Sequence, residues 1–212
     1  MNESGIRVAV ILGSVRPGNY TGKAAALVVD ELRSRNVHVD VIDPSSMQLP
    51  LPGTGTSPDA ERMADIVRDA TALVMCTPEY HGGLSSVMKL VIENMGFPSA
   101  MSGKPVALLG VAAGRIGAIK SLEMLRSICS HVGCLVLPGP VSVAGVNKAF
   151  EEDGSVLDPA VEKSVRGVAT GLVDYLNRHV CPRMALEAMV REGATEWGRP
   201  GERLRPQSRG TA

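Results

Sequence analysis

The sequence of 212 residues has few aromatic residues and no excess of charge of either sign. Aromatic residues make up 3% of the chain, and 22 lysines and arginines balance 22 aspartates and glutamates. Modules that read nucleic-acid bases with exposed aromatic side chains are therefore not expected, and neither is a broad electrostatic surface for nucleic acid or an anionic membrane. We predict no nucleic-acid partner and no membrane partner.

The sequence also lacks long apolar runs and clusters of cysteine or histidine. No apolar run approaches the ~20 residues that cross a bilayer, and the N-terminus lacks a secretion signal, so we expect a cytoplasmic protein. The four cysteines show no C-x-x-C spacing, and the four histidines form no metal-ligand pattern. We predict no metal site, and Cys76, Cys129 and Cys134 lie in apolar segments, as core thiols do.

What the sequence does contain is a regular alternation of aliphatic strands and amphipathic helices. Residues 6–12 form an aliphatic run that ends at Gly13, as in a strand buried on both faces of a parallel sheet. Further strands are predicted at 37–42, 72–76, 105–111 and 134–137, and helices at 21–35, 58–70, 84–95, 119–132 and 159–179. Five alternating pairs predict an α/β fold, a flavodoxin-like doubly wound five-stranded parallel sheet of order 2-1-3-4-5 with helices on both faces.

The composition changes near residue 180. We assign residues 1–180 to one flavodoxin-like domain and residues 181–212 to a C-terminal extension, because prolines, glycines, six arginines and four glutamates interrupt any core pattern there. A short helix is expected at 184–192. The end after Pro200 is expected to be disordered or docked on a partner subunit.

In such a sheet, ligands bind beyond the carboxyl ends of the strands. The first loop there, residues 13–21, carries hydroxyl groups, Arg16 and the backbone N–H groups of a helix start, which together can hold a phosphate. A plain glycine and proline turn with a solvated arginine is the alternative. The loop lacks G-x-G-x-x-G, and Asn19 stands where a Walker A lysine would follow Gly18, so a terminal phosphate monoester fits better than a dinucleotide or a triphosphate.

Two further loops lie at the same edge. Residues 77–83 place Pro78, Tyr80 and two glycines where backbone groups can face a flat polar heterocycle, although they are equally compatible with a simple connection from strand to helix. Residues 112–117 are small enough to let a planar ligand approach the backbone, although these glycines can also serve helix–strand packing.

Together the three loops resemble the NADPH-dependent FMN reductase family of the flavodoxin superfamily, with its azoreductase-like and chromate- or quinone-reductase-like members. The resemblance covers residues 6–180. Its most specific parts are G-S-x-R at residues 13–16 and the P-E-Y-N/H-G motif at residues 78–82. The following helix reads Met88-Lys89-Leu90, so the usual asparagine of an L-K-N segment is absent.

The resemblance implies FMN as the cofactor and NADPH or NADH as the co-substrate. No catalytic side chain is implied, because the nicotinamide passes a hydride to flavin N5 and the electrons go on to a small acceptor such as a free flavin, a quinone or an azo compound. The implied FMN-binding residues fall in the three loops. They are Ser14, Arg16, Asn19, Tyr20 and Thr21 around the phosphate, Pro78, Glu79, Tyr80, His81 and Gly82 along the isoalloxazine edge, and Ala113, Gly114, Arg115 and Gly117 beside the ring. Asn19 and Thr21 depart from the residues common at their positions.

Other functions stay open at this point. One is an FMN-dependent dehydrogenase or reductase of a dedicated biosynthetic metabolite, and others are a flavodoxin-like electron carrier and a nucleotide-binding regulator. Electron carriers are usually acidic, unlike this neutral chain, and a hydrolase is disfavoured because no G-x-S-x-G motif is present. Leu90, Ile92 and Met124 lie outside the apolar helical stripes, and relatives pair through these helices, so a homodimer or homotetramer is expected.

Overall fold

The computed structural model describes residues 5–191, and its centre is a parallel sheet of order β2-β1-β3-β5-β6. The register runs without interruption through β1, where Val8 pairs with Val39 on one side and with Ala72 on the other. This order confirms the flavodoxin-like prediction, because β5 and β6 are the fourth and fifth parallel strands along the chain. The five strands are β1 (Arg7–Leu12), β2 (His38–Ile42), β3 (Ala72–Tyr80), β5 (Pro105–Val111) and β6 (Leu135–Val136).

Two short strands were not predicted, and both change the C-terminal edge of the sheet. β4 (Gly83–Leu84) pairs antiparallel with the end of β3, so β3 continues to Tyr80 and the predicted loop at 77–83 is mostly strand. β7 (Val141–Val143) pairs with the end of β5, while β6 pairs with its start. The single strand expected at 134–137 therefore corresponds to β6 alone, and pairing with β5 resumes at β7, beyond the expected range. Pro138 and Pro140 lie between β6 and β7, and proline has no N–H to donate to a neighbouring strand.

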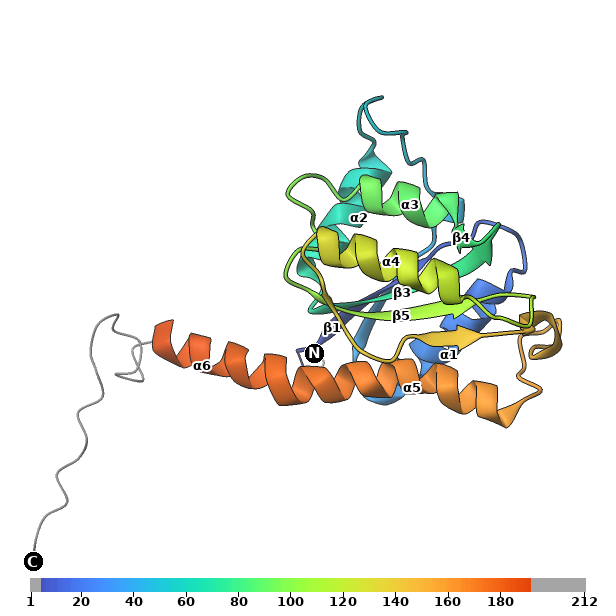
Figure 1. Ribbon diagram of the computed structural model, residues 1–212. Coiled ribbons are helices and arrows are strands. Elements are labelled where there is room, and N and C mark those ends of the chain that lie inside the picture. Colours follow the sequence, from blue (N-terminus) through green and yellow to red (C-terminus); the bar gives the residue numbers. More distant parts are fainter. Residues whose placement is uncertain (1–4, 192–212) are drawn as a thin grey trace, which may run out of the picture. The chain divides into compact units, whose positions relative to one another are not determined.

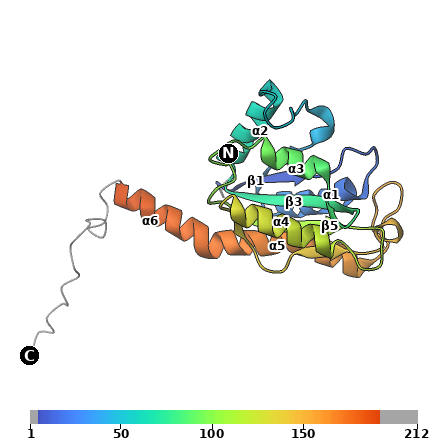
Figure 2. The same cartoon turned by 45° about the horizontal axis from the view of Figure 1, so that its top comes forward.

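Helices cover both faces of the sheet, as predicted. Figures 1 and 2 show α2, α3 and α4 on one face and α1 and α5 on the other. Side chains cap the starts of four helices: Asn19 accepts from the Gly22 N–H, Ser57 from the Ala60 N–H, Ser85 from the Met88 N–H and Asp158 from the Ala160 N–H. The helices are α1 (Tyr20–Ser34), α2 (Pro58–Asp69), α3 (Ser86–Glu93), α4 (Ile119–His131) and α5 (Pro159–Tyr175), with 3₁₀ turns η1 (Pro44–Ser46) and η2 (Val146–Lys148).

The core is aliphatic and rich in methionine. Met63, Met75 and Met88 are fully buried in the core between the sheet and helices α2 to α4. Cys76, Cys129 and Cys134 are buried as predicted, and burial raises the pKa of the Cys76 thiol to about 12, so it is a packing residue. Ile92, expected to lie outside the core stripe, is 6% exposed and belongs to the core.

The chain divides into two units after Val173. In the second unit, a π-helical turn η3 (Leu176–Val180) replaces the end of the predicted helix at 159–179, and α6 (Cys181–Arg191) starts three residues before the predicted short helix. Every described side chain of α6 is at least partly exposed. The expectation for the end after Pro200 lies outside the described residues, and the boundary at residue 180 stays a prediction.

Within residues 5–191, no helix combines the length and the apolar character that crossing a membrane requires. The expected cytoplasmic location stays a prediction.

Candidate functional site

A pocket of about 490 Å³ opens where β1, β3 and β5 end, at the edge of the sheet predicted to bind a ligand. Residues from all three predicted loops line it, together with the last residue of β5 and one residue from the segment that follows β7. The lining residues are Arg16, Pro17, Gly18, Asn19, Tyr20, Thr21, Pro78, Glu79, Tyr80, Val111, Ala112, Ala113 and Val146.

The first loop is tied to the sheet by its backbone. The Gly13 N–H donates to the Cys76 carbonyl at 2.7 Å, and a Cβ at Gly13 would lie 2.9 Å from that oxygen, so the chain can leave β1 here only as glycine. The Ser85 hydroxyl donates to the Gly13 carbonyl at 2.5 Å. Further along, the Asn19 Nδ2 donates to the Arg16 carbonyl at 2.7 Å, which folds the loop over the start of α1.

Two groups in this loop fit a phosphate. The Thr21 side chain lines the pocket and the residue is 2% exposed, yet its hydroxyl has no hydrogen-bond partner among residues 5–191. A buried polar group without a partner is costly, and a bound oxyanion would satisfy it. Arg16 also forms no ion pair with any carboxylate in that range. Both lie at the positive N-terminal end of α1, so the residues present fit a phosphate group.

Tyr80 joins the first loop to the second. The Arg16 guanidinium lies 4.4 Å from the centre of the Tyr80 ring, and the Ser14 hydroxyl lies 3.5 Å from the Tyr80 hydroxyl. A cation over an aromatic face is attracted to it. Arg16 is thus held at the pocket by stacking rather than by an acidic partner, which leaves its N–H groups available to an anion.

The second loop is a two-residue hairpin turn. Between the paired residues Tyr80 and Gly83, His81 has φ +50° and Gly82 has φ +75°. A turn with two positive φ values strongly prefers glycine second and tolerates Asn, Asp or His first. Backbone geometry therefore explains the N/H-G part of the motif. His81 and Gly82 lie outside the pocket lining.

The third loop is tied to the segment after β7. The Ala112 N–H donates to the Val143 carbonyl at 2.9 Å, and the Val146 N–H donates to the Ala112 carbonyl at 3.0 Å. These bonds bring Val146 into the pocket, although it lies 33 residues beyond Ala113 in the sequence. A small apolar wall of Ala112, Ala113 and Val146 results, and it suits a flat ring.

Side chains of β3 and β7 accept hydrogen bonds at the start of α4. Ala118, the residue before the helix, makes no side-chain cap, and its N–H donates to the Ser142 Oγ at 2.8 Å. The Ser121 N–H donates to the Glu79 Oε2 at 3.1 Å, which places a carboxylate at the positive end of the helix. Glu79 therefore has a structural role as well as a position in the pocket lining.

The sequence of the chain is similar to those of known proteins. The model of the NADPH-dependent FMN reductase family matches residues 6–148. The chain belongs to this family. An NAD(P)H-dependent FMN reductase of Pseudomonas aeruginosa is 30% identical to this chain over 179 residues. The match covers 82% of this chain and 96% of the relative. A quinone reductase of Escherichia coli is 26% identical over 185 residues, with coverage of 82% and 96%.

A solved structure of another protein has the same fold as this chain. The flavoenzyme NAD(P)H:(acceptor) oxidoreductase of Paracoccus denitrificans superposes with a TM-score of 0.70 at 24% identity, covering 82% of this chain and 98% of that chain. Family membership confirms the sequence-based resemblance. It makes the chain an FMN-dependent NAD(P)H oxidoreductase rather than an electron carrier or a regulator without catalysis.

The structure brings together most, not all, of the residues predicted to form the reductase site. Those that line the pocket are Arg16, Asn19, Tyr20, Thr21, Pro78, Glu79, Tyr80 and Ala113. Ser14 is buried beside Tyr80, Gly114 and Arg115 are exposed on the third loop, and Gly117 is buried below it. The pocket also includes Pro17, Gly18, Val111, Ala112 and Val146, which were not predicted as site residues. Pro17, Gly18 and Ala112 adjoin predicted residues and Val111 lies two residues before Ala113, whereas Val146 carries no sequence signal.

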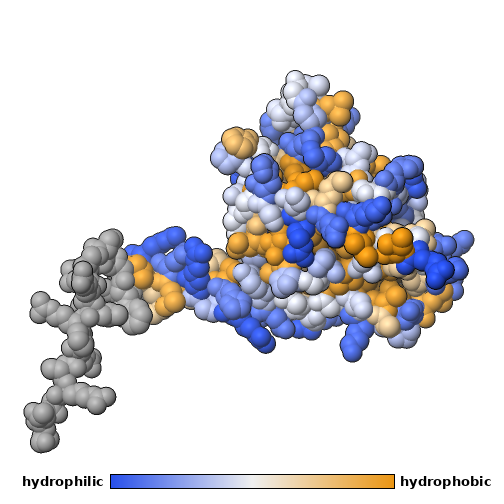
Figure 3. Space-filling view, viewed as in Figure 1, coloured by the Kyte–Doolittle hydropathy of each residue, from blue (hydrophilic) through white to orange (hydrophobic). Residues whose placement is uncertain are grey.

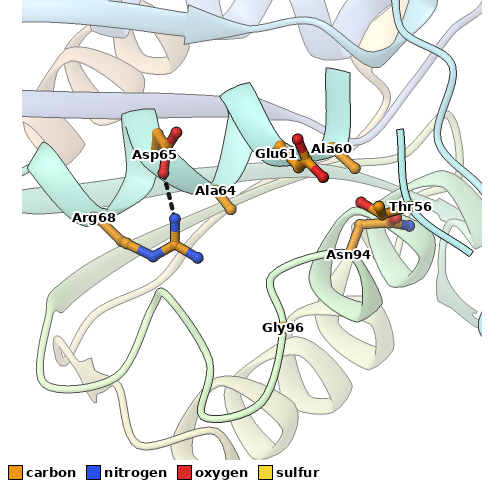
Figure 4. A pocket seen from close by; sticks show the side chains of 8 residues that line it. All are labelled: Thr56, Ala60, Glu61, Ala64, Asp65, Arg68, Asn94 and Gly96. Atoms are coloured by element: carbon orange, nitrogen blue, oxygen red, sulfur yellow. Dashed lines mark hydrogen bonds and ion pairs between the residues drawn. The ribbon is translucent and has the colours of Figure 1, made fainter. Parts of the chain in front are cut away.

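A second pocket, of about 390 Å³, lies between α2 and the chain that follows α3 (Figure 4). Most of its polar side chains form ion pairs or hydrogen bonds within the protein. Asp65 forms an ion pair with Arg68, and the Asn94 Nδ2 donates to the carbonyls of Pro50 and Leu90. No group of histidine, cysteine, aspartate and glutamate side chains within residues 5–191 could hold a metal ion. The first pocket is therefore the candidate site of this family member.

Proposed function

We propose that this chain binds FMN in the pocket at the ends of β1, β3 and β5, and uses NADPH or NADH to reduce a small acceptor such as a free flavin, a quinone or an azo compound. The observation that carries the proposal is that the pocket at the start of α1 is lined by the buried Thr21, whose hydroxyl has no partner among residues 5–191, and by Arg16, which forms no ion pair in that range. Bound FMN would supply hydride acceptance from the nicotinamide and electron transfer to the acceptor.

Different residues of the pocket would bind the phosphate and the ring of FMN. Arg16, Thr21 and the free N–H groups at the start of α1 bind the phosphate dianion. Tyr80, held against Arg16, connects that end to the hairpin whose backbone faces the ring edge. Ala112, Ala113 and Val146 form the apolar wall and exclude water on that side. No acidic or basic side chain needs to exchange a proton with the ring, so the protein acts by positioning.

The test is a flavin titration followed by reduction. Adding FMN to the purified protein should quench flavin fluorescence with a stoichiometry of one per chain, and anaerobic NADPH or NADH should then bleach the yellow colour. A panel of free flavin, quinone and azo acceptors would identify the acceptor class from the rate at which the colour returns. A preparation that neither contains nor binds FMN contradicts the proposal, and bound flavin that neither dinucleotide reduces favours a dedicated metabolite as the reductant.

We also propose that the chain forms a homodimer or a larger homo-oligomer through α4 and its flanking loop. Ile116, Ile119 and Met124 are 77%, 47% and 46% exposed, and Figure 3 shows apolar side chains gathered in a band over α4. An apolar band of this kind is typical of a surface that another protein covers. It includes Ile116, which lies in the same loop as the pocket-lining Ala112 and Ala113.

The assembly proposal predicts the molecular mass in solution. Light scattering should give at least twice the 22.3 kDa of one chain. Met124→Glu should lower the mass toward the monomer, because a buried unpaired carboxylate opposes association. Leu157→Glu, at an exposed residue before α5, is the matched control and should leave the mass unchanged. A wild-type monomer would contradict the proposal.

A further inference from the structure

A lysine lies against the β3–β4 hairpin turn, which follows the pocket-lining residue Tyr80. If Gly82 carried a Cβ, it would lie 3.6 Å from the Cδ and 3.8 Å from the Nζ of Lys120. Gly82 follows Tyr80, which lines the pocket, by two residues. The exposed Lys120 side chain is therefore beside the β3–β4 turn, two residues along the chain from the pocket-lining Tyr80, and the lack of a side chain at Gly82 leaves it room.

The fold itself gives no reason for a cation at this position. Lys120 is the second residue of α4, and the first turn of this helix contains no acidic residue. The N-terminal end of a helix carries partial positive charge, so a lysine there is unfavourable. Across the described part of the chain, Lys120 forms no ion pair with a carboxylate, while Glu79 caps the adjacent Ser121 N–H. A cation that the helix does not favour and no acidic group neutralises is available to an external anion.

A second unpaired cation lies on the neighbouring loop. Arg115 is exposed in the turn closed by the Gly117 N–H, which donates to the Gly114 carbonyl at 3.2 Å, and that turn leads directly into α4. Arg115 also lacks a carboxylate partner within residues 5–191. FMN has one phosphate, which we assign to the first loop, so Lys120 beside the second loop and Arg115 in the third loop would be left without an anion. A nicotinamide dinucleotide carries additional phosphates that would supply one.

We infer that Lys120, assisted by Arg115, binds a phosphate group of the nicotinamide dinucleotide and thereby sets the affinity for this co-substrate. The inference rests on the proposed function. The shared chemistry is a phosphate dianion or diester near the pocket rim, from either the ribose 2′-phosphate of NADPH or the pyrophosphate present in both dinucleotides. Both cations act in binding, and neither takes part in hydride transfer.

The experiment compares Lys120→Met with the wild type in anaerobic stopped-flow reduction of the FMN-loaded protein. The dissociation constant of the dinucleotide, read from the dependence of the reduction rate on its concentration, should rise about tenfold, as expected for one charge-assisted hydrogen bond. The limiting rate at saturation should not change. Lys120→Arg should retain most of the affinity. A loss with NADPH alone assigns the 2′-phosphate, and an equal loss with NADH assigns the pyrophosphate.

Lys163→Met is the matched control, because Lys163 is exposed on α5 on the other face of the sheet and its loss changes the net charge equally. An equal weakening in this control would mean general electrostatic attraction and would overturn the inference. So would an unchanged dissociation constant in Lys120→Met. FMN binding is measured separately for every variant, so failure of the wild type to bind FMN contradicts the proposed function, whereas normal FMN binding with unchanged dinucleotide affinity contradicts the role of Lys120.

Discussion

Replacement of Arg16 by methionine should weaken FMN binding about 100-fold, as expected when a guanidinium that donates two hydrogen bonds to a phosphate is lost. Binding of riboflavin, which has no phosphate, should change by less than about threefold, because Arg16 contributes little to the ring. The ratio of the two dissociation constants, measured by flavin fluorescence titration, is the decisive quantity. Arg16 is exposed and has no carboxylate partner among residues 5–191, so its loss should leave the free energy of unfolding nearly unchanged.

Two further variants separate the phosphate contact from the stacking contact with Tyr80. Thr21→Val removes the buried hydroxyl at nearly constant volume and should weaken FMN binding about tenfold. As with Arg16→Met, the binding of riboflavin should change much less. Tyr80→Phe keeps the ring under Arg16 but removes the hydroxyl near Ser14, and should alter FMN binding much less. If Arg16→Met weakened FMN and riboflavin equally, Arg16 would act through Tyr80 and the pocket would not place the phosphate at this loop.

The sequence predicted the sheet well because parallel strands buried on both faces have a pattern that does not depend on the rest of the fold. Residues 6–12 and 105–111 are mostly aliphatic, and both are central strands in the structure. β4 and β7 were missed because strands of two or three residues are too short for such a pattern. Their existence depends on pairing with β3 and β5, which is a tertiary contact.

The site was predicted less completely, since glycine and polar residues serve both the backbone and a ligand. Gly82 and Gly117 were predicted to contact the flavin, but their positive φ values show that the turns themselves require glycine. Asn19 was assigned to the phosphate, and in the structure its side chain caps α1 and holds the Arg16 carbonyl. Val146 reaches the pocket through two backbone hydrogen bonds between distant segments, and nothing local in the sequence indicates such contacts.

Replacement of Gly117 by alanine should lower the free energy of unfolding by about 2–4 kcal/mol, measured by urea denaturation. Gly117 has φ +79°, where an L side chain is strained by about 1–2 kcal/mol. In addition, its Cβ would lie 2.4 Å from the Ser142 Oγ, the atom that accepts the Ala118 N–H and caps α4. The substitution therefore strains the turn and displaces the helix cap together. FMN affinity should fall as well, because α4 and the third loop lose their common anchor.

Gly114→Ala is the matched control for this substitution. Gly114 lies in the same loop, its φ is not in the positive region, and a Cβ there would meet no atom within 4 Å, so the change should stay within about 0.5 kcal/mol. Ser142→Ala alone should cost about 1 kcal/mol through the lost cap. In the double variant, Ser142→Ala removes the atom that collides with the new Cβ but leaves the backbone strain at residue 117. The double variant should therefore lose less free energy of unfolding than the two single variants added together. Strict additivity would show that the Ser142 hydroxyl is not what excludes a side chain at residue 117.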